Sequence, residues 1–160
     1  MGVLTQEKAL LYSADFESGQ LEGWKLGSGW EIAENEDGHA LAGQGHVLAT
    51  YTAGSWSDYR LRFKVKLTGN GSLHTNFRSL EGPTRYFIGL NREGLYISKQ
   101  TGPESFSENL ANAEGLGSGW KNIEISGYGP TVSVSVNRKA VMEYTDLESI
   151  LSGVLLRDPD

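Results

Sequence analysis

The sequence predicts an all-β protein, and two observations lead to that prediction. One is composition: the 160 residues include 21 glycines, 7 tyrosines, 5 phenylalanines and 4 tryptophans, and no cysteine. Such a composition is typical of short strands joined by many turns. The other is a strict alternation of apolar and polar residues in several segments, which is the period of a strand with one buried side. The length suits one domain that buries its core without disulfides or metals.

The clearest alternation lies in residues 56–67, around which the rest of the chain is organised. From Arg60 onward, every second residue is apolar, and a helix would divide these residues between opposite sides. They are Leu61, Phe63, Val65 and Leu67. The sequence therefore predicts a strand that packs one sheet face against a core.

The opposite face of that strand is basic. Its residues are Arg60, Arg62, Lys64 and Lys66. A row of like charges suggests a ligand, but such side chains are more often hydrated or paired with carboxylates on the next strand. We therefore expect a structural role for this row.

Short strands and turns are expected on both sides of the central strand. Residues 1–10 form a polar lead-in, and Asp37-Gly38 is a strong hairpin signal. Residues 101–119 lack clear periodicity, and such a loop in a compact domain is usually functional or mobile. The remaining segments expected as strands are 11–17, 21–24, 30–34, 40–42, 46–50, 73–78, 85–91, 95–100, 120–126, 131–137 and 140–145. Segments 73–78, 85–91 and 95–100 are expected to form an antiparallel meander.

Charge and hydropathy exclude several partners. The net charge of −6 and the pI near 5.1 argue against nucleic acid, whose binding proteins usually carry clustered positive charge. No segment approaches the roughly 18 consecutive apolar residues of a membrane span. Residues 1–11 contain Gln, Glu and Lys where a signal peptide would be apolar. The chain is therefore either cytoplasmic or one module of a longer exported protein.

The order of the motifs matches a known group of proteins. The motifs are Asp15-Phe16-Glu17, Gly23-Trp24, Trp30-Glu31-Ile32, Trp56-Ser57-Asp58-Tyr59, Phe77-Arg78, Tyr86, Trp120 and residues 132–137. Over residues 11–156, the chain resembles the concanavalin A-like lectin and glucanase jelly rolls. Among these it is most similar to laminin-G-like and family-66-like carbohydrate-binding modules and to the related 3-keto-disaccharide hydrolase domains. It departs from them after Asn137, where Arg138 stands in place of their usual glycine.

The resemblance implies a concanavalin A-like jelly roll, which is a two-sheet antiparallel β-sandwich, at residues 11–156, with residues 157–160 beginning a linker. It also implies a sugar-binding sheet face. Alternation places His74, Asn76 and Arg78 on one face of their strand, and it groups Tyr96 with Gln100 and Tyr86 with Ile88. Planar amides, a guanidinium and aromatic rings suit a sugar, because they bond pairs of hydroxyls and stack on its C–H face.

We therefore predict a sugar site formed by His74, Asn76, Arg78, Tyr86, Tyr96 and Gln100. Arg78 is the strongest candidate, because the related modules often hold an arginine there. The alternative is that these polar residues face solvent without a ligand. Trp56 is a candidate stacking platform, whereas the other tryptophans stand where related modules use tryptophan in the core. These are Trp24, Trp30 and Trp120.

Catalytic signals are weak. Residues 31–36 (Glu-Ile-Ala-Glu-Asn-Glu) lack the central aspartate of the family-16 glucanase motif, and glycoside hydrolysis normally needs two close carboxylates. His39, His46 and His74 show no zinc spacing. The spacing of these carboxylates and histidines indicates no required cofactor, and we expect no enzyme activity. The resemblance allows a structural calcium ion, for which Asp15, Glu17 and Asp146 are the candidate ligands.

The sequence thus predicts a non-catalytic module that binds an oligo- or polysaccharide. We expect it to belong to a larger secreted or surface protein, of bacterial type, in which other domains are possible partners. One alternative is a structural or protein-interaction β-sandwich that binds no sugar. Another is a glycoside hydrolase-like enzyme, which would require a close pair of carboxylates.

Overall fold

In the computed structural model, residues 16–17, 23–36, 38–45, 49–51, 58–78 and 85–147 are described. All regular structure in these residues is β-strand, which confirms the all-β prediction. Within them, no helix has the length and apolar character to cross a membrane. The chain divides into two compact units, Met1–Gly54 and Ser55–Asp160, and each is described by itself.

The first unit contains two antiparallel strand pairs. Strand β1 (Trp24–Leu26) pairs with β4 (Ala49–Tyr51), and β2 (Trp30–Asn35) pairs with β3 (Gly38–Gly43). The β2–β3 pair confirms the hairpin predicted from Asp37-Gly38, since Asn35 and Gly38 are register partners. The Trp30 ring lies directly over Gly43, where a Cβ atom would come within 2.7 Å of it.

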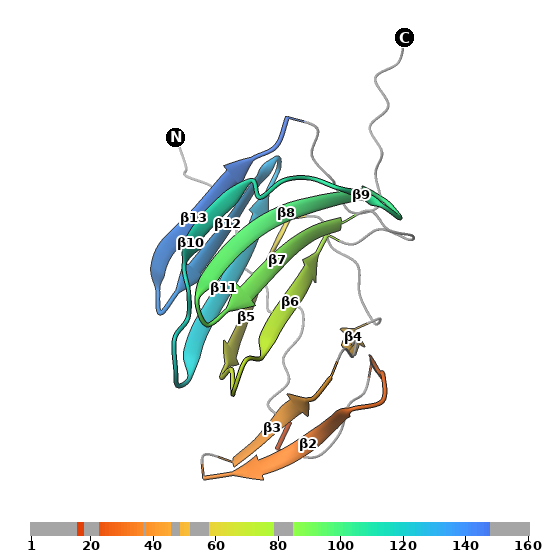
Figure 1. Ribbon diagram of the computed structural model, residues 1–160, viewed down its shortest axis with the longest axis vertical. Helices are drawn as coiled ribbons and strands as arrows, with labels where there is room; N and C mark the ends of the chain where they lie inside the picture. The colour runs from red at the N-terminus through yellow and green to blue at the C-terminus, as the bar shows by residue number, and fades with distance from the viewer. Residues whose placement is uncertain are drawn as a thin grey trace, which may run out of the picture. The chain divides into compact units, whose positions relative to one another are not determined.

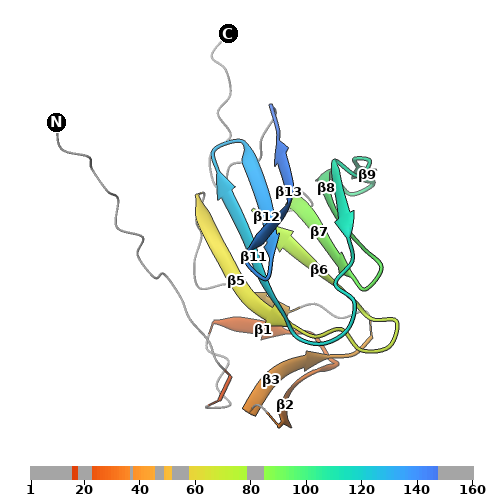
Figure 2. The same ribbon diagram turned by 90° about the vertical axis from the view of Figure 1, so that its left-hand side faces the viewer.

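The second unit contains two antiparallel sheets. One has the order β10-β8-β7-β6, with β9 also paired to β8, and the other has the order β13-β12-β11-β5. Figure 2 shows them as two layers, and Figure 1 looks onto the layer that contains β6, β7 and β8. The strands are β5 (Tyr59–Val65), β6 (Ser72–Phe77), β7 (Arg85–Asn91), β8 (Gly94–Gly102), β9 (Ser105–Phe106), β10 (Ala111–Glu114), β11 (Lys121–Tyr128), β12 (Thr131–Val136) and β13 (Lys139–Thr145).

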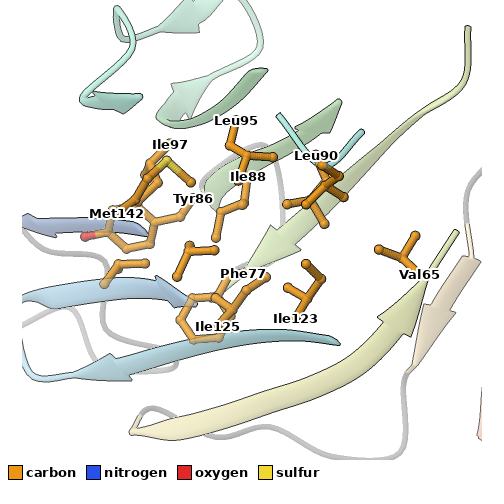
Figure 3. Close-up of a cluster of buried hydrophobic side chains, with 13 residues drawn as sticks. Val65, Phe77, Tyr86, Ile88, Leu90, Leu95, Ile97, Ile123, Ile125 and Met142 are labelled. Atoms are coloured by element: carbon orange, nitrogen blue, oxygen red, sulfur yellow. The ribbon is translucent and has the colours of Figure 1, made fainter. Parts of the chain in front are cut away.

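The core lies between these two sheets, because strand alternation turns one apolar face of each sheet toward the other. Figure 3 shows the side chains that meet there. The buried apolar residues are Val65, Phe77, Tyr86, Ile88, Leu90, Leu95, Ile97, Leu116, Ile123, Ile125, Val132, Val134 and Met142. Phe63 and Leu67 pack against them. The predicted meander and the late strands are therefore confirmed, and so is the core-facing strand except at Leu61, which is 36% exposed.

Two expectations about the later part of the chain are wrong. Residues 101–119 are not one long loop, because they contain β9 and β10, and both strands pair with β8. A four-residue strand with alternating Ala, Asn, Ala and Glu has too little apolar character to stand out in the sequence. Trp120 is not a core residue: it is 40% exposed, immediately before β11.

The basic row on β5 has the structural role that we expected. Glu124 on the neighbouring β11 forms ion pairs with Arg60 and with Arg62, at 3.3 Å and 2.6 Å. Lys64 and Lys66 are exposed to solvent. This outer face of the β5 sheet is thus a paired and hydrated surface.

Candidate functional site

The outer face of the other sheet carries a mixed aromatic and polar surface. Three rows of register partners cross β6, β7 and β8 on the side away from the core: His74, Gly89 and Tyr96; Asn76, Phe87 and Ser98; Arg85 and Gln100. We call the six larger side chains the aromatic–polar face. They are His74, Asn76, Arg85, Phe87, Tyr96 and Gln100.

The aromatic part of this face is built around a glycine. Gly89 is buried beneath the Tyr96 ring, and a Cβ atom at position 89 would come within 2.2 Å of that ring. Phe87 lies 4.5 Å from His74 and 6.2 Å from Tyr96, measured between ring centroids. The absence of a side chain at Gly89 therefore lets Tyr96 lie across β7 and join the other two rings.

The polar part of the face is built around Arg85. Its Nε donates a hydrogen bond to Gln100 Oε1 at 2.7 Å, and its Nη1 donates one to Asn76 Oδ1 at 2.8 Å. The guanidinium also lies over the Phe87 ring, 5.1 Å from its centroid. Gln100, which is only 5% exposed, donates in turn to the carbonyl of Gly102. The arginine is thus held in one orientation by groups on three strands.

The Tyr96 hydroxyl is a neutral group at ordinary pH. Burial raises the pKa of Tyr96 above its usual value of 10.0, so the hydroxyl keeps its proton. It lies 3.4 Å from Nε2 of His74. The face therefore offers a hydroxyl, an imidazole, two side-chain amides and a guanidinium beside the rings of Phe87 and Tyr96, which together can hydrogen-bond hydroxyls and stack on a sugar ring.

Four of the residues predicted for the sugar site come together on this face: His74, Asn76, Tyr96 and Gln100. Sequence reasoning missed Arg85 and Phe87. The signal that would have found them is the alternation of β7 itself. Its more apolar set, which contains Ile88 and Leu90, had to face the core. That choice leaves Arg85 and Phe87 to face outward.

The predicted position of Tyr86 on the sugar-binding face is wrong. Tyr86 is 0% exposed and belongs to the core, as its place in the same alternating set as Ile88 requires. Its hydroxyl donates to Asp146 Oδ2 at 2.8 Å, and that same oxygen lies 2.7 Å from Lys99 Nζ. The phenol is therefore used to satisfy a buried ionic group.

The predicted position of Arg78 beside His74 and Asn76 is wrong for a different reason. Strand β6 ends at Phe77, and Arg78 has a positive φ of 51°, which breaks the period of two. Its side chain is 0% exposed. It donates to the carbonyl of Gly129 and to Asp58 Oδ1. Arg78 therefore binds protein groups at the end of the sandwich, and we do not include it in the candidate site.

Several other candidate residues are placed elsewhere or are not described. Trp56, Asp15 and His46 lie outside the described residues. Of the proposed calcium ligands, Glu17 binds His39 at 2.9 Å and Asp146 binds Lys99. A calcium ion at Asp146 would have to displace an ammonium group, so the contacts of this carboxylate do not fit the ion. Among the described residues, no group of three or more metal-ligating side chains is present.

One exposed aromatic side chain adjoins the face. Phe106 on β9 is the register partner of Gln100, and it is 55% exposed. Because register partners in an antiparallel pair point to the same side of the sheet, Phe106 extends the surface beyond Arg85. The sequence showed it only as an apolar residue in an aperiodic segment.

Comparison with solved structures shows the same fold elsewhere. The carbohydrate-binding module CBM66 from Bacillus subtilis superimposes with a TM-score of 0.59 at 18% sequence identity, over 81% of this chain and 82% of that chain. This likeness confirms the predicted concanavalin A-like jelly roll. No curated protein sequence matches the chain. Residues 12–153 match the model of a protein family described as 3-keto-alpha-glucoside-1,2-lyase-like domains. The chain therefore belongs to the family of 3-keto-alpha-glucoside-1,2-lyase-like domains.

Proposed function

We propose that this chain binds carbohydrate through the aromatic–polar face. The observation that supports this most is the arrangement around Arg85, which hydrogen-bonds Asn76 and Gln100 and lies over Phe87. A fixed guanidinium with neighbouring amides is suited to the paired hydroxyls of a sugar. The Tyr96 and Phe87 rings supply the flat apolar surface that a sugar's C–H face needs.

We further propose that the module is non-catalytic and belongs to a larger secreted or surface protein. The six residues of the face include no aspartate or glutamate, whereas glycoside hydrolysis normally uses a pair of carboxylates. The structural likeness to a module named for carbohydrate binding also supports a non-catalytic role. The location outside the cell follows from this proposed role.

The direct test is binding of the purified chain to a broad glycan array, followed by titration calorimetry with the glycans that bind. Tyr96→Ala removes the ring that covers Gly89, and we expect it to weaken binding about 10-fold or more, since stacking and hydrogen-bonding groups are worth ~1–3 kcal/mol each. Arg62→Ala is the matched control, because Arg62 lies on the outer face of the other sheet. Equal affinities for both variants would contradict the proposed site.

A second candidate function is the elimination chemistry that the family description names. The contact between His74 Nε2 and the Tyr96 hydroxyl, at 3.4 Å, favours it, because an imidazole can accept the proton next to a ketone. In such a reaction, the C2 proton of a 3-keto-glucoside passes to the base. The C1–O bond breaks, and the leaving alkoxide takes up a proton. The product has a double bond conjugated to the ketone.

The test of this second function is an absorbance assay on a 3-keto-glucoside. A rising signal from the conjugated ketone that His74→Ala abolishes, and Arg62→Ala does not, would establish the lyase. No turnover by the unchanged chain would leave carbohydrate binding as the function.

A further inference from the structure

Among the described arginines that are partly or fully buried, Arg85 differs from Arg60 and Arg78 in what it binds. The arginines and the lysine that lie near a carboxylate are Arg60 and Arg62 with Glu124, Arg78 with Asp58, and Lys99 with Asp146. Arg85 is half-buried, yet among the described residues it has no carboxylate within ion-pair distance. Its hydrogen-bond acceptors are two neutral amide oxygens.

The two amides orient the charge but do not neutralise it. They occupy Nε and one proton of Nη1. A guanidinium has five N–H donors. Among the described residues, no acceptor is present for Nη2 or for the second proton of Nη1, so these donors are available to a ligand. Taking a cation partly out of water without a counter-charge is unfavourable, and a bound anion would remove that cost.

The shape of the free donors indicates which anion fits. Nη1 and Nη2 form a planar fork, and a planar carboxylate can accept from both at once. The rings of Phe87 and Tyr96 lie on the same face, 6.2 Å apart and nearly parallel at 27°, where they can stack against a sugar. The ligand that uses both features is a sugar that carries a carboxylate.

We infer that the glycan recognised by this face is acidic, and that Arg85 binds the carboxylate of a uronic acid residue in it. This inference rests on the proposed carbohydrate-binding function. The net charge of −6 does not oppose it locally, because the six residues of the face contribute no negative charge. A neutral sugar could accept hydrogen bonds from Arg85, but it would leave the guanidinium without a counter-charge.

The experiment compares matched pairs of glycans by titration calorimetry with the full chain. Oligomers of galacturonate, of alginate and of glucuronoxylan are each tested beside their carboxyl-reduced forms, which keep the backbone and lose the charge. We expect one acidic oligomer to bind at least about 10-fold more tightly than its reduced form, as a charge-assisted bidentate contact requires. We also expect this preference to shrink as NaCl is raised.

Variants show whether Arg85 is the cause. Arg85→Gln should abolish the preference for the acidic form, Arg85→Lys should keep part of it because the charge remains without the fork, and Arg62→Gln should leave it unchanged. Thermal unfolding identifies any variant that fails to fold. If Arg85→Gln does not fold, the preference of Arg85→Lys for the acidic over the reduced glycan tests the inference instead. Equal binding of acidic and reduced forms would overturn this inference alone. A preference for sulfated glycans would overturn the carboxylate assignment, and silence of every glycan on a broad array would overturn the proposed function as well.

Discussion

The guanidinium of Arg78 lies against the backbone of Gly127 on the opposite sheet, so closely that a Cβ atom at position 127 would come within 2.7 Å of Arg78 Nη2. The same guanidinium bonds the Gly129 carbonyl and Asp58, and Asp58 Oδ1 also accepts from the Gly129 amide. Arg78 thus connects the end of β6 to the β11–β12 turn.

Gly127→Ala should destabilise the protein by about 2 kcal/mol, because the added methyl group displaces a buried guanidinium from its hydrogen bonds to Gly129 and Asp58. The measurement is denaturant unfolding of both proteins. Gly94→Ala is the control, since its nearest contact would be the Ala113 carbonyl at 3.9 Å. If Gly127→Ala and Gly94→Ala lost similar amounts of unfolding free energy, the Arg78 guanidinium would be able to move away from position 127 without cost.

Arg138→Gly should stabilise the protein by about 0.5 to 1 kcal/mol. Asn137 and Arg138 have φ angles of 49° and 69° between the partners Val136 and Lys139, which is the conformation of a two-residue hairpin turn that favours Asn-Gly. An L-residue pays ~1–2 kcal/mol for this conformation, and glycine does not. The measurement is the thermal unfolding midpoint of Arg138→Gly and of Arg138→Ala. The midpoint of the alanine variant should not rise above that of the unchanged chain. A gain for both variants would point to the lost charge instead.

The contact between His39 and Glu17 should respond to pH. The hydrogen bond that His39 donates to Glu17 raises the pKa of His39 above its usual 6.5, so the contact stabilises at low pH and is lost as the pH rises through the raised value. The hydrogen bond from His39 lowers the pKa of Glu17 below its usual 4.5, so the contact is also lost as the pH falls through that lowered value. The contact is therefore fully present from pH 4.5 to pH 6.5.

NMR titration of the histidine ring protons in the full chain measures this effect. In Glu17→Gln, the pKa of His39 should fall toward 6.5. An unchanged His39 midpoint would mean that the two side chains do not interact in solution.

Much of the fold could be predicted from the sequence, because alternation over several residues determines which side of a strand is buried. Residues 63–65 and 132–134 show this, since Phe63, Val65, Val132 and Val134 belong to the core or pack against it. Strand β10 could not be predicted, since its four residues are Ala, Asn, Ala and Glu. Its position depends on pairing with β8, which is a contact between distant parts of the chain.

The candidate site was half predictable for a related reason. His74 and Asn76 follow the period of their own strand, so they were placed correctly. Arg78 breaks that period through a positive φ that no neighbouring glycine or proline announces. Tyr86 follows the period of its strand, which buries it with Ile88, but the acceptor for its hydroxyl is Asp146, 60 residues later in the chain.

Asp146→Ala should destabilise the protein by about 3 kcal/mol or more, because it leaves the ammonium of Lys99 without its counter-charge. The side chains of Lys99 and Asp146 are 12% and 9% exposed. Replacing both, as Lys99→Met with Asp146→Leu, should restore part of that loss, since apolar residues of similar size tolerate burial, while the Tyr86 hydroxyl still loses its acceptor. Denaturant unfolding of the single and double variants checks this, and a double variant no more stable than Asp146→Ala would contradict it.

Gly89→Ala should weaken glycan binding while leaving most of the stability intact. A methyl group at position 89 would meet the Tyr96 ring at 2.2 Å, so the ring must rise from the sheet and lose its alignment with Phe87. Because Tyr96 is only partly buried, we expect this movement to cost ~1 kcal/mol of stability and a larger share of the binding energy. Calorimetry with the best array glycan measures the affinity, and Gly94→Ala on the neighbouring strand is the control. If Gly89→Ala bound as tightly as the unchanged chain, the position of the Tyr96 ring over β7 would not matter for recognition, and the sugar would have to bind through the Arg85 end of the face.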